Sequence, residues 1–185
     1  MNPNDAQEIQ LSDVKPIVST TDLWGIIKYA NKYFQKVSGY TEEELIGSPH
    51  NIIRHPDMPK VIFKLMWERI KKDKNILAIV KNRTKSGDYY WVTTLFETKY
   101  HPLTKNREGY LAIRKAAPRH AIEKIIPLYQ KLLEIERHEG VEASEDYLID
   151  FLVEQNMDYD TYVKDLVDNQ GITTKFFNSI KKMFG

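Results

Sequence analysis

The chain has 185 residues, of which 42% are hydrophobic and 29% charged, and its formal net charge is +1. These values are typical of a soluble globular protein that buries one good core and has length for a second small unit. The near-zero net charge argues against a nucleic-acid surface, and the absence of cysteine excludes disulfides, thiolate metal sites and cysteine nucleophiles. The N-terminus is polar, unlike a signal peptide, and no run reaches the roughly 18 apolar residues that span a bilayer. We therefore expect a cytoplasmic protein with no transmembrane segment of its own.

The first part of the chain predicts a hairpin followed by a helix. Residues 1–14 are polar, and we expect a flexible N-terminus there. Two short runs rich in β-branched and isoleucine residues, 16–20 and 24–29, are separated by a Thr-Asp turn and predict paired strands. The spacing of apolar residues over 31–37 then predicts a helix, which the following Ser-Gly pair ends.

The next stretch frames a proline-rich segment between two helices. Thr41 and Glu44 form the pattern of a capping box, which predicts one short helical turn. Residues 47–59 contain two histidines, an arginine and an aspartate among three prolines. Since proline fixes the backbone, these polar groups are presented in a set geometry. Apolar residues spaced by three, four and seven then predict a helix over 61–72.

Three β-rich runs complete the first unit, at 76–84, 89–100 and 107–115. A Gly-containing turn joins the first two into a long hairpin. Two strands, several short helices and three further strands imply an α+β fold. We predict a five-stranded antiparallel sheet, with short helices on one face, over residues 15–117.

The pattern becomes helical over 118–185. Apolar stripes predict helices around 122–133, 147–152 and 159–167. The tail at 172–184 predicts a basic amphipathic helix with phenylalanines on one side and lysines on the other. Packing on the preceding helices is the favoured interpretation of this tail, and a weak contact with a membrane surface or a partner is the alternative.

Several stretches resemble the PAS domain family. Residues 38–47 (Ser-Gly-Tyr-Thr-Glu-Glu-Glu-Leu-Ile-Gly) and 85–92 (Lys-Ser-Gly-Asp-Tyr-Tyr-Trp-Val) are typical of PAS domains in general. Residues 51–59 (Asn-Ile-Ile-Arg-His-Pro-Asp-Met-Pro) and 79–83 (Ile-Val-Lys-Asn-Arg) are more specific, and together they resemble the sensory domain of the aerotaxis receptor family. The likeness extends over about residues 15–130. It implies a PAS fold that binds FAD without covalent attachment and reports redox state to the chemotaxis machinery.

The residues that the resemblance suggests for cofactor binding are five polar side chains and one tryptophan: Asn31, Arg54, His55, Asp57, Trp67 and Asn82. The Asn82 amide can pair with both donors and acceptors of a flavin edge. Arg54 offers a planar fork for phosphate or carboxylate, and His55 can hydrogen-bond in either protonation state. Asp57 can hold Arg54 or His55 in place.

Each of these residues also has a structural interpretation. Asn31 stands where a helix N-cap is expected, Arg54 and Asp57 could form an ion pair, and His55 could be a buried, hydrogen-bonded histidine. The three tryptophans are typical of core or hairpin positions, and Trp67 is the best candidate among them for a pocket wall.

Two departures from related patterns bear on the cofactor. The aerotaxis pattern has a tryptophan where this chain has Ile76, which gives an apolar wall but cannot stack or pass an electron. Light-sensing flavin domains of the LOV type use a cysteine where this chain has His50, so a cysteinyl adduct is excluded. A histidine there also keeps an alternative cofactor open, haem b, with His50 or His55 as the axial ligand.

We therefore expect a non-enzymatic redox sensor for energy taxis that binds FAD and signals through protein contacts. Its expected partner is a membrane-anchored methyl-accepting chemotaxis protein, which would hold it at the inner membrane, and a homodimer is a further option. A haem-based gas or redox sensor and a cofactor-free PAS interaction module are the alternatives. No nucleophile–base set, phosphate-binding glycine loop or metal-ligand spacing favours an enzyme or a metal site.

Overall fold

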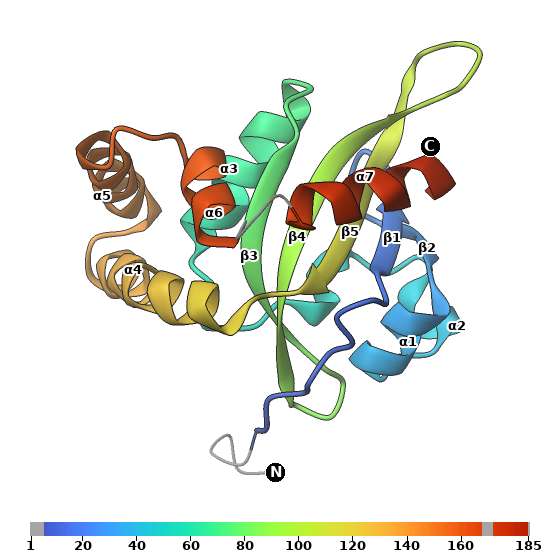
Figure 1. Cartoon of the computed structure of the whole chain (residues 1–185), viewed down its shortest axis with the longest axis horizontal. Coiled ribbons are helices and arrows are strands. Elements are labelled where there is room, and N and C mark those ends of the chain that lie inside the picture. Colours follow the sequence, from blue (N-terminus) through green and yellow to red (C-terminus); the bar gives the residue numbers. More distant parts are fainter. Residues whose placement is uncertain (1–5, 168–171, 185) are drawn as a thin grey trace.

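The computed structural model describes residues 6–167 and 172–184, and its centre is a five-stranded antiparallel sheet (Figure 1). The strands are β1 (Ile17–Thr21), β2 (Ile27–Ala30), β3 (Ile76–Arg83), β4 (Tyr89–Tyr100) and β5 (Arg107–Ala116). They lie in the order β2-β1-β5-β4-β3. The pairing of β1 with β5 therefore joins the β1–β2 hairpin to the three consecutive antiparallel strands β3, β4 and β5. The predicted α+β fold with a five-stranded antiparallel sheet is confirmed.

Helices cover both faces of this sheet. They are α1 (Lys32–Ser38), α2 (Glu42–Leu45), the 3₁₀ helix η2 (His50–Ile53), α3 (Lys60–Lys71), α4 (Arg119–His138), α5 (Val141–Glu154), α6 (Tyr159–Val167) and α7 (Ile172–Phe184). The short helices and α3 lie on one face, and the C-terminal helices α4, α6 and α7 lie on the other (Figure 1). Because side chains alternate along a strand, Arg114 of β5 points to the first face and Lys115 to the second. Lys115 there contacts the ring of Phe176 on α7.

Both ends of the described chain contact the sheet. Residues 7 and 9, within the segment expected to be flexible, form backbone hydrogen bonds with Tyr89 at the start of β4. At the other end, Phe177 of α7 is 4% exposed and belongs to the main hydrophobic core. This burial supports the packing interpretation of the amphipathic tail.

The proline-rich segment crosses the first face of the sheet and is held at its start and in its middle. At its start, backbone hydrogen bonds join Ser48 and His50 to the β1–β2 hairpin at Ile27 and Gly25. In its middle, Arg54 forms an isolated antiparallel bridge with Asn82 of β3. These pairings place η2 opposite α3 across the sheet face.

The N-terminus of α3 is capped by a residue from the C-terminal helices. Pro59 precedes the helix and supplies no side-chain cap. The Glu136 carboxylate on α4 instead accepts hydrogen bonds from the backbone N–H groups of Lys60 and Val61, at 3.0 and 2.8 Å. An acceptor is needed there because the first N–H groups of a helix have no partner within the helix. The α3 helix is therefore tied to α4.

Candidate functional site

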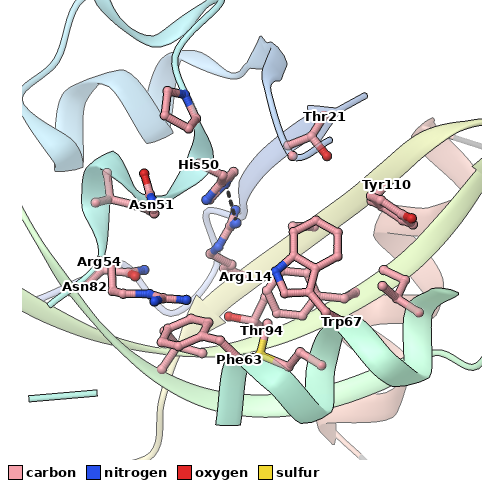
Figure 2. Close-up of a pocket in the computed structure, with 18 of the residues that line it drawn as sticks. Thr21, His50, Asn51, Arg54, Phe63, Trp67, Asn82, Thr94, Tyr110 and Arg114 are labelled. Atoms are coloured by element: carbon pink, nitrogen blue, oxygen red, sulfur yellow. Dashed lines mark hydrogen bonds between the residues drawn. The ribbon is translucent and has the colours of Figure 1, made fainter. Parts of the chain in front are cut away.

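A cavity of about 350 Å³ lies between the first face of the sheet, η2 and α3 (Figure 2). Its volume falls within the range of roughly 300–1,000 Å³ that is usual for small-molecule sites. Much of its wall is apolar, formed by Ile53, Phe63, Met66, Trp67, Val80 and Phe96. A cavity with such a wall accommodates a ligand that has a large apolar part.

Two tryptophans contribute to the wall of the cavity where it approaches solvent. Trp24, in the β1–β2 turn, is 80% exposed, and Trp67 of α3 is 36% exposed. The Trp67 ring meets Tyr110 edge-on with 5.4 Å between centroids. A Cβ at Gly25 would lie 3.2 Å from the Trp67 ring, so glycine allows this close approach. Trp67 therefore packs where the hairpin turn and α3 meet, as the sequence predicts for a pocket wall.

Three buried polar atoms of the lining residues have no hydrogen-bond partner among the described residues. They are Arg54 Nε, Asn82 Nδ2 and Thr94 Oγ1. The Asn82 amide lies near the Tyr90 hydroxyl, but neither side chain reaches hydrogen-bond geometry with the other. Since buried polar groups in proteins are nearly always paired, these three atoms offer hydrogen-bonding positions to a polar ligand or to water.

Arg54 is held in place by stacking rather than by the predicted ion pair. Its guanidinium carbon lies 3.5 Å from the centroid of the Phe63 ring. Burial lowers the pKa of Arg54, and the negative charge of Glu136 partly opposes this shift. The charged guanidinium of Arg54 therefore forms a cation–π contact with the Phe63 ring at the cavity wall.

A second arginine reaches the cavity from β5. Arg114 is 2% exposed, and its NH1 group lies 3.1 Å from Ser19 Oγ. Its NH2 group lies 2.8 Å from His50 Nε2 (Figure 2). Burial lowers the pKa of Arg114 to about 10, so the side chain is still charged at neutral pH. Burial and the charge of Arg114 together lower the pKa of His50 to about 3, so His50 is neutral.

Asn31 does not line the cavity. Its side-chain oxygen accepts from the Phe34 N–H at 2.9 Å and caps α1, and it also lies 3.2 Å from the Val18 nitrogen. Its amide group donates to the Pro16 carbonyl at 2.9 Å. Asn31 thus joins β1 to α1, as its N-cap interpretation predicts, and its side-chain donors and acceptor are used within the fold.

His55 and Asp57 also lie outside the lining of this cavity. Arg54 pairs with β3 and points to the cavity, and the chain then turns away over Lys81, whose side chain faces the opposite side of the strand from Asn82. Asp57 pairs with Lys81 at 2.8 Å, and His55 Nδ1 accepts from the Asp57 N–H. Burial and Lys81 lower the pKa of His55 to about 4, so its contact with Asp57 is not an ion pair at neutral pH.

The structure therefore brings together Arg54, Trp67 and Asn82 of the six predicted residues, and His50 of the haem alternative. Sequence reasoning missed Arg114 and Thr94, which are directly paired across β4 and β5. The one signal in the sequence was the alternation of side chains along β5. It places Arg114 on the same side of the strand as Tyr110, and Leu111 and Ile113 on the other side.

The charged side chains that line the cavity are all cationic, and no metal-binding cluster is found among the described residues. No aspartate or glutamate is among the described residues that line the cavity, although two arginines are. Within residues 6–167 and 172–184, no cluster of three or more potential metal-binding side chains occurs. In the same part of the chain, no helix combines the length and apolarity needed to cross a membrane.

Comparison with known proteins identifies the class first. Residues 27–109 match the family model described as the PAS fold, so the chain contains a PAS domain. This domain is of the aerotaxis receptor family: the aerotaxis receptor of Escherichia coli (strain K12) is 44% identical over 128 residues, which are 68% of this chain and 24% of that receptor.

Two further similarities are weaker. The bacterioopsin transcriptional activator of Halobacterium salinarum is 25% identical over 75 residues, covering 40% of this chain and 11% of the activator. The chain thus spans about a quarter or less of the curated relatives it matches. A solved structure from work on a flavin analogue and the mechanism of a light-oxygen-voltage domain has a TM-score of 0.51 at 16% identity, covering 63% of this chain and 86% of that one. This last likeness concerns the fold alone.

Proposed function

We propose that the chain binds FAD in this cavity and acts as a non-enzymatic redox sensor for energy taxis. The observation that carries the proposal is the convergence of three unpaired buried polar atoms, on Arg54, Asn82 and Thr94, around an apolar slot. A flavin presents an apolar ring with a polar pyrimidine edge, and its dinucleotide adds phosphates. The identity to the aerotaxis receptor supports the same assignment.

The residues of the cavity fit this cofactor by chemical type. Asn82 and Thr94 would hydrogen-bond the polar edge of the ring, and Phe63 and Trp67 would contact its apolar part. Arg54 would hold a phosphate or another electron-rich oxygen. When bound, FAD supplies the reversible uptake of electrons and protons. The neutral His50 and the cationic Arg54 and Arg114 determine which protonation state the cavity favours.

The haem alternative has less support from the same geometry. His50 lines the cavity, but its Nε2 accepts a hydrogen bond from Arg114, and an axial ligand would need that atom free. His55 lies outside the lining, and its Nδ1 accepts from the Asp57 N–H. No specific observation favours haem over flavin.

The output of the sensor would pass from the cavity wall to the C-terminal helices. The Tyr129 hydroxyl of α4 donates to the Ile79 carbonyl of β3 at 2.7 Å, and Asp160 of α6 accepts from the Leu77 N–H at 2.6 Å. On α3, Lys64 pairs with Glu145 of α5 at 2.6 Å. A shift of β3 or α3 would therefore move α4, α5 and α6. We propose that this helical region contacts a membrane-anchored chemotaxis receptor and that the chain works on the cytoplasmic side.

An absorption spectrum of the purified chain tests the cofactor. We expect the two-banded yellow spectrum of flavin, with FAD released on denaturation. A sharp Soret band would instead favour haem, and a colourless protein that takes up neither cofactor would favour an interaction module. If flavin is present, Arg54→Ala should lose it more readily than His120→Ala, since His120 is an exposed residue on α4. Equal retention by both variants would show that the cofactor is bound elsewhere.

A further inference from the structure

Arg114 is a buried charge whose protein contacts are neutral. Its guanidinium donates to Ser19 Oγ and His50 Nε2, and it lies 5.6 and 5.8 Å from the rings of Phe34 and Phe96. No ion pair joins it to a carboxylate among the described residues, and the nearby Tyr90 hydroxyl is uncharged at neutral pH because burial raises its pKa. A buried guanidinium without a counter-ion is costly, because desolvation is not offset by an opposite charge.

The protonation of His50 follows from this contact. Arginine has only donors, so His50 Nε2 must accept, and the ring proton is then on Nδ1. The neutral imidazole stacks on Phe34 with 5.9 Å between ring centroids. His50 and Ser19 therefore orient the guanidinium without neutralising it.

The rest of the cavity does not neutralise it either. The second charged residue of the lining, Arg54, is also a cation, and none of the described lining residues is acidic. Thr94, which is paired directly with Arg114 across the sheet, contributes an unpaired hydroxyl. The cavity thus has excess positive charge, and the charge of Arg114 acts strongly because that side chain is itself only 2% exposed.

We propose that Arg114 pairs with the anionic reduced form of the cofactor, so that this chain binds reduced flavin more tightly than oxidised flavin. This inference rests on the proposed function. Two-electron reduction of FAD with uptake of one proton gives the anion, whereas uptake of a second proton gives the neutral reduced form. Arg114 favours the anion, raises the reduction potential and keeps the second proton off. Ser19 and His50 are positioning residues for the guanidinium.

Three variants of the full chain test this role. Arg114→Gln removes the charge, Arg114→Lys keeps it without the planar fork, and Arg83→Gln removes an exposed arginine of the same sheet as a matched control. Each FAD-loaded protein is reduced anaerobically with dithionite against a reference dye, in buffers that span the pH range over which free reduced flavin binds its second proton. The potential and its slope with pH are recorded, together with the thermal stability of the FAD-free proteins.

For the native chain and Arg83→Gln we expect one proton per two electrons throughout this range. Arg114→Gln should have a lower potential, equivalent to at least about tenfold weaker binding of the reduced form relative to the oxidised form, and should take up two protons in acidic buffers. Its FAD-free form should be at least as stable as the native protein, since an unpaired buried charge is removed. If Arg114→Gln retains no FAD, the same measurement is made on Arg114→Lys. The reduction potential of Arg114→Lys should change with pH as expected for one proton per two electrons.

The opposite results are distinct from one another. A native chain that takes up no FAD overturns the proposed function and this inference with it. An FAD-loaded Arg114→Gln with native potential and slope overturns the inference alone, as does a two-proton slope in Arg114→Lys. Loss of stability in the FAD-free Arg114→Gln variant, with the potential unchanged, would show that Arg114 only supports the fold.

Discussion

Arg54 and Asn82 are paired through their backbones by an isolated antiparallel bridge, and both side chains reach the same cavity. This pairing joins the middle of the proline-rich segment to the strand that carries the Val-Lys-Asn-Arg sequence. The two stretches that most resemble the aerotaxis receptor family are therefore one structural unit. The unit leaves Arg54 Nε and Asn82 Nδ2 without partners among the described residues.

Thr93 and Thr94 offer a comparison between the two faces of the sheet. Both are wholly buried, both hydroxyls lack a partner among the described residues, and Thr94 lines the cavity while Thr93 points to the opposite face. Thr94→Val should weaken FAD binding by roughly two- to tenfold through the loss of one hydrogen bond, as measured by fluorescence titration. Thr93→Val should leave the affinity unchanged. Equal weakening by both substitutions would mean that the cofactor does not contact Thr94.

The same two substitutions predict an effect on stability in the absence of cofactor. Each removes a buried hydroxyl that has no partner, so neither should lower the free energy of unfolding, and each could raise it by about 1 kcal/mol. Urea denaturation of the FAD-free proteins measures this directly. A loss of more than about 1 kcal/mol in either variant would show that its hydroxyl is hydrogen-bonded in solution.

The Glu136 carboxylate should stabilise the protein by capping α3. Glu136→Ala removes the acceptor for the Lys60 and Val61 N–H groups and should lower the free energy of unfolding by about 1 kcal/mol. Glu134→Ala is the control, since Glu134 forms an exposed pair with Lys131 and no other ion pair among the described residues, so its loss should cost less than about 0.5 kcal/mol. Chemical denaturation of both variants distinguishes them, and an equal effect would contradict a capping role.

Tyr129 and Tyr159 form a buried hydroxyl pair with 2.6 Å between their oxygens. Tyr129 donates to the Ile79 carbonyl, so Tyr159 must donate to Tyr129. Tyr129→Phe should lower the free energy of unfolding by about 1–3 kcal/mol, because it leaves the Tyr159 hydroxyl without its acceptor. Tyr159→Phe should cost less, since Tyr129 keeps its bond to the strand. In a double-mutant cycle the two effects should not add, and strict additivity would show that the hydroxyls do not interact.

Acid should destabilise the protein through His50. The folded state holds the pKa of His50 at about 3, below its ordinary value of 6.5, so the unfolded state binds the proton first. This contribution to stability is complete above pH 6.5 and is lost as the pH falls from 6.5 toward 3, by at most about 1.4 kcal/mol per pH unit. His55, with its pKa lowered to about 4, acts in the same direction.

The His50→Gln variant isolates this dependence. Its free energy of unfolding should change less steeply with pH than that of the native protein below pH 6.5. Urea denaturation at a series of pH values gives both slopes. Parallel curves for the native protein and His50→Gln would mean that His50 already titrates normally in the folded state.

The fold was predictable because its local signals agree with one another. The strands and helices are marked by periodicity, by the Thr41–Glu44 capping box and by turn residues, and the structure contains that capping box in full. The pairing of β1 with β5, which closes the sheet, has no local signal and was not predicted from the sequence. Tertiary pairing of this kind depends on contacts far apart in sequence.

The candidate site was predictable where a residue lies in a specific motif. Arg54, Asn82 and Trp67 reach the cavity, but His55 and Asp57 follow Arg54 directly and turn to the other side of β3. Which face a motif residue takes depends on the bridge at Arg54, and the motif does not encode that choice. Arg114 was missed because both faces of β5 are buried, so an alternating pattern does not show which side is the core.

The cap on α3 changes what counts as the sensory unit of this chain. A fragment ending at residue 117 would contain every strand and every residue that lines the cavity. It would lack the Glu136 carboxylate. The α3 helix, which carries Phe63, Met66 and Trp67, would then have no side-chain acceptor for its first backbone N–H groups, since Pro59 supplies none. The smallest piece that keeps the pocket wall rigid therefore extends into α4, beyond the residues that match the PAS family. The α4 helix, which is proposed to pass the signal on, therefore also supports the wall of the cavity.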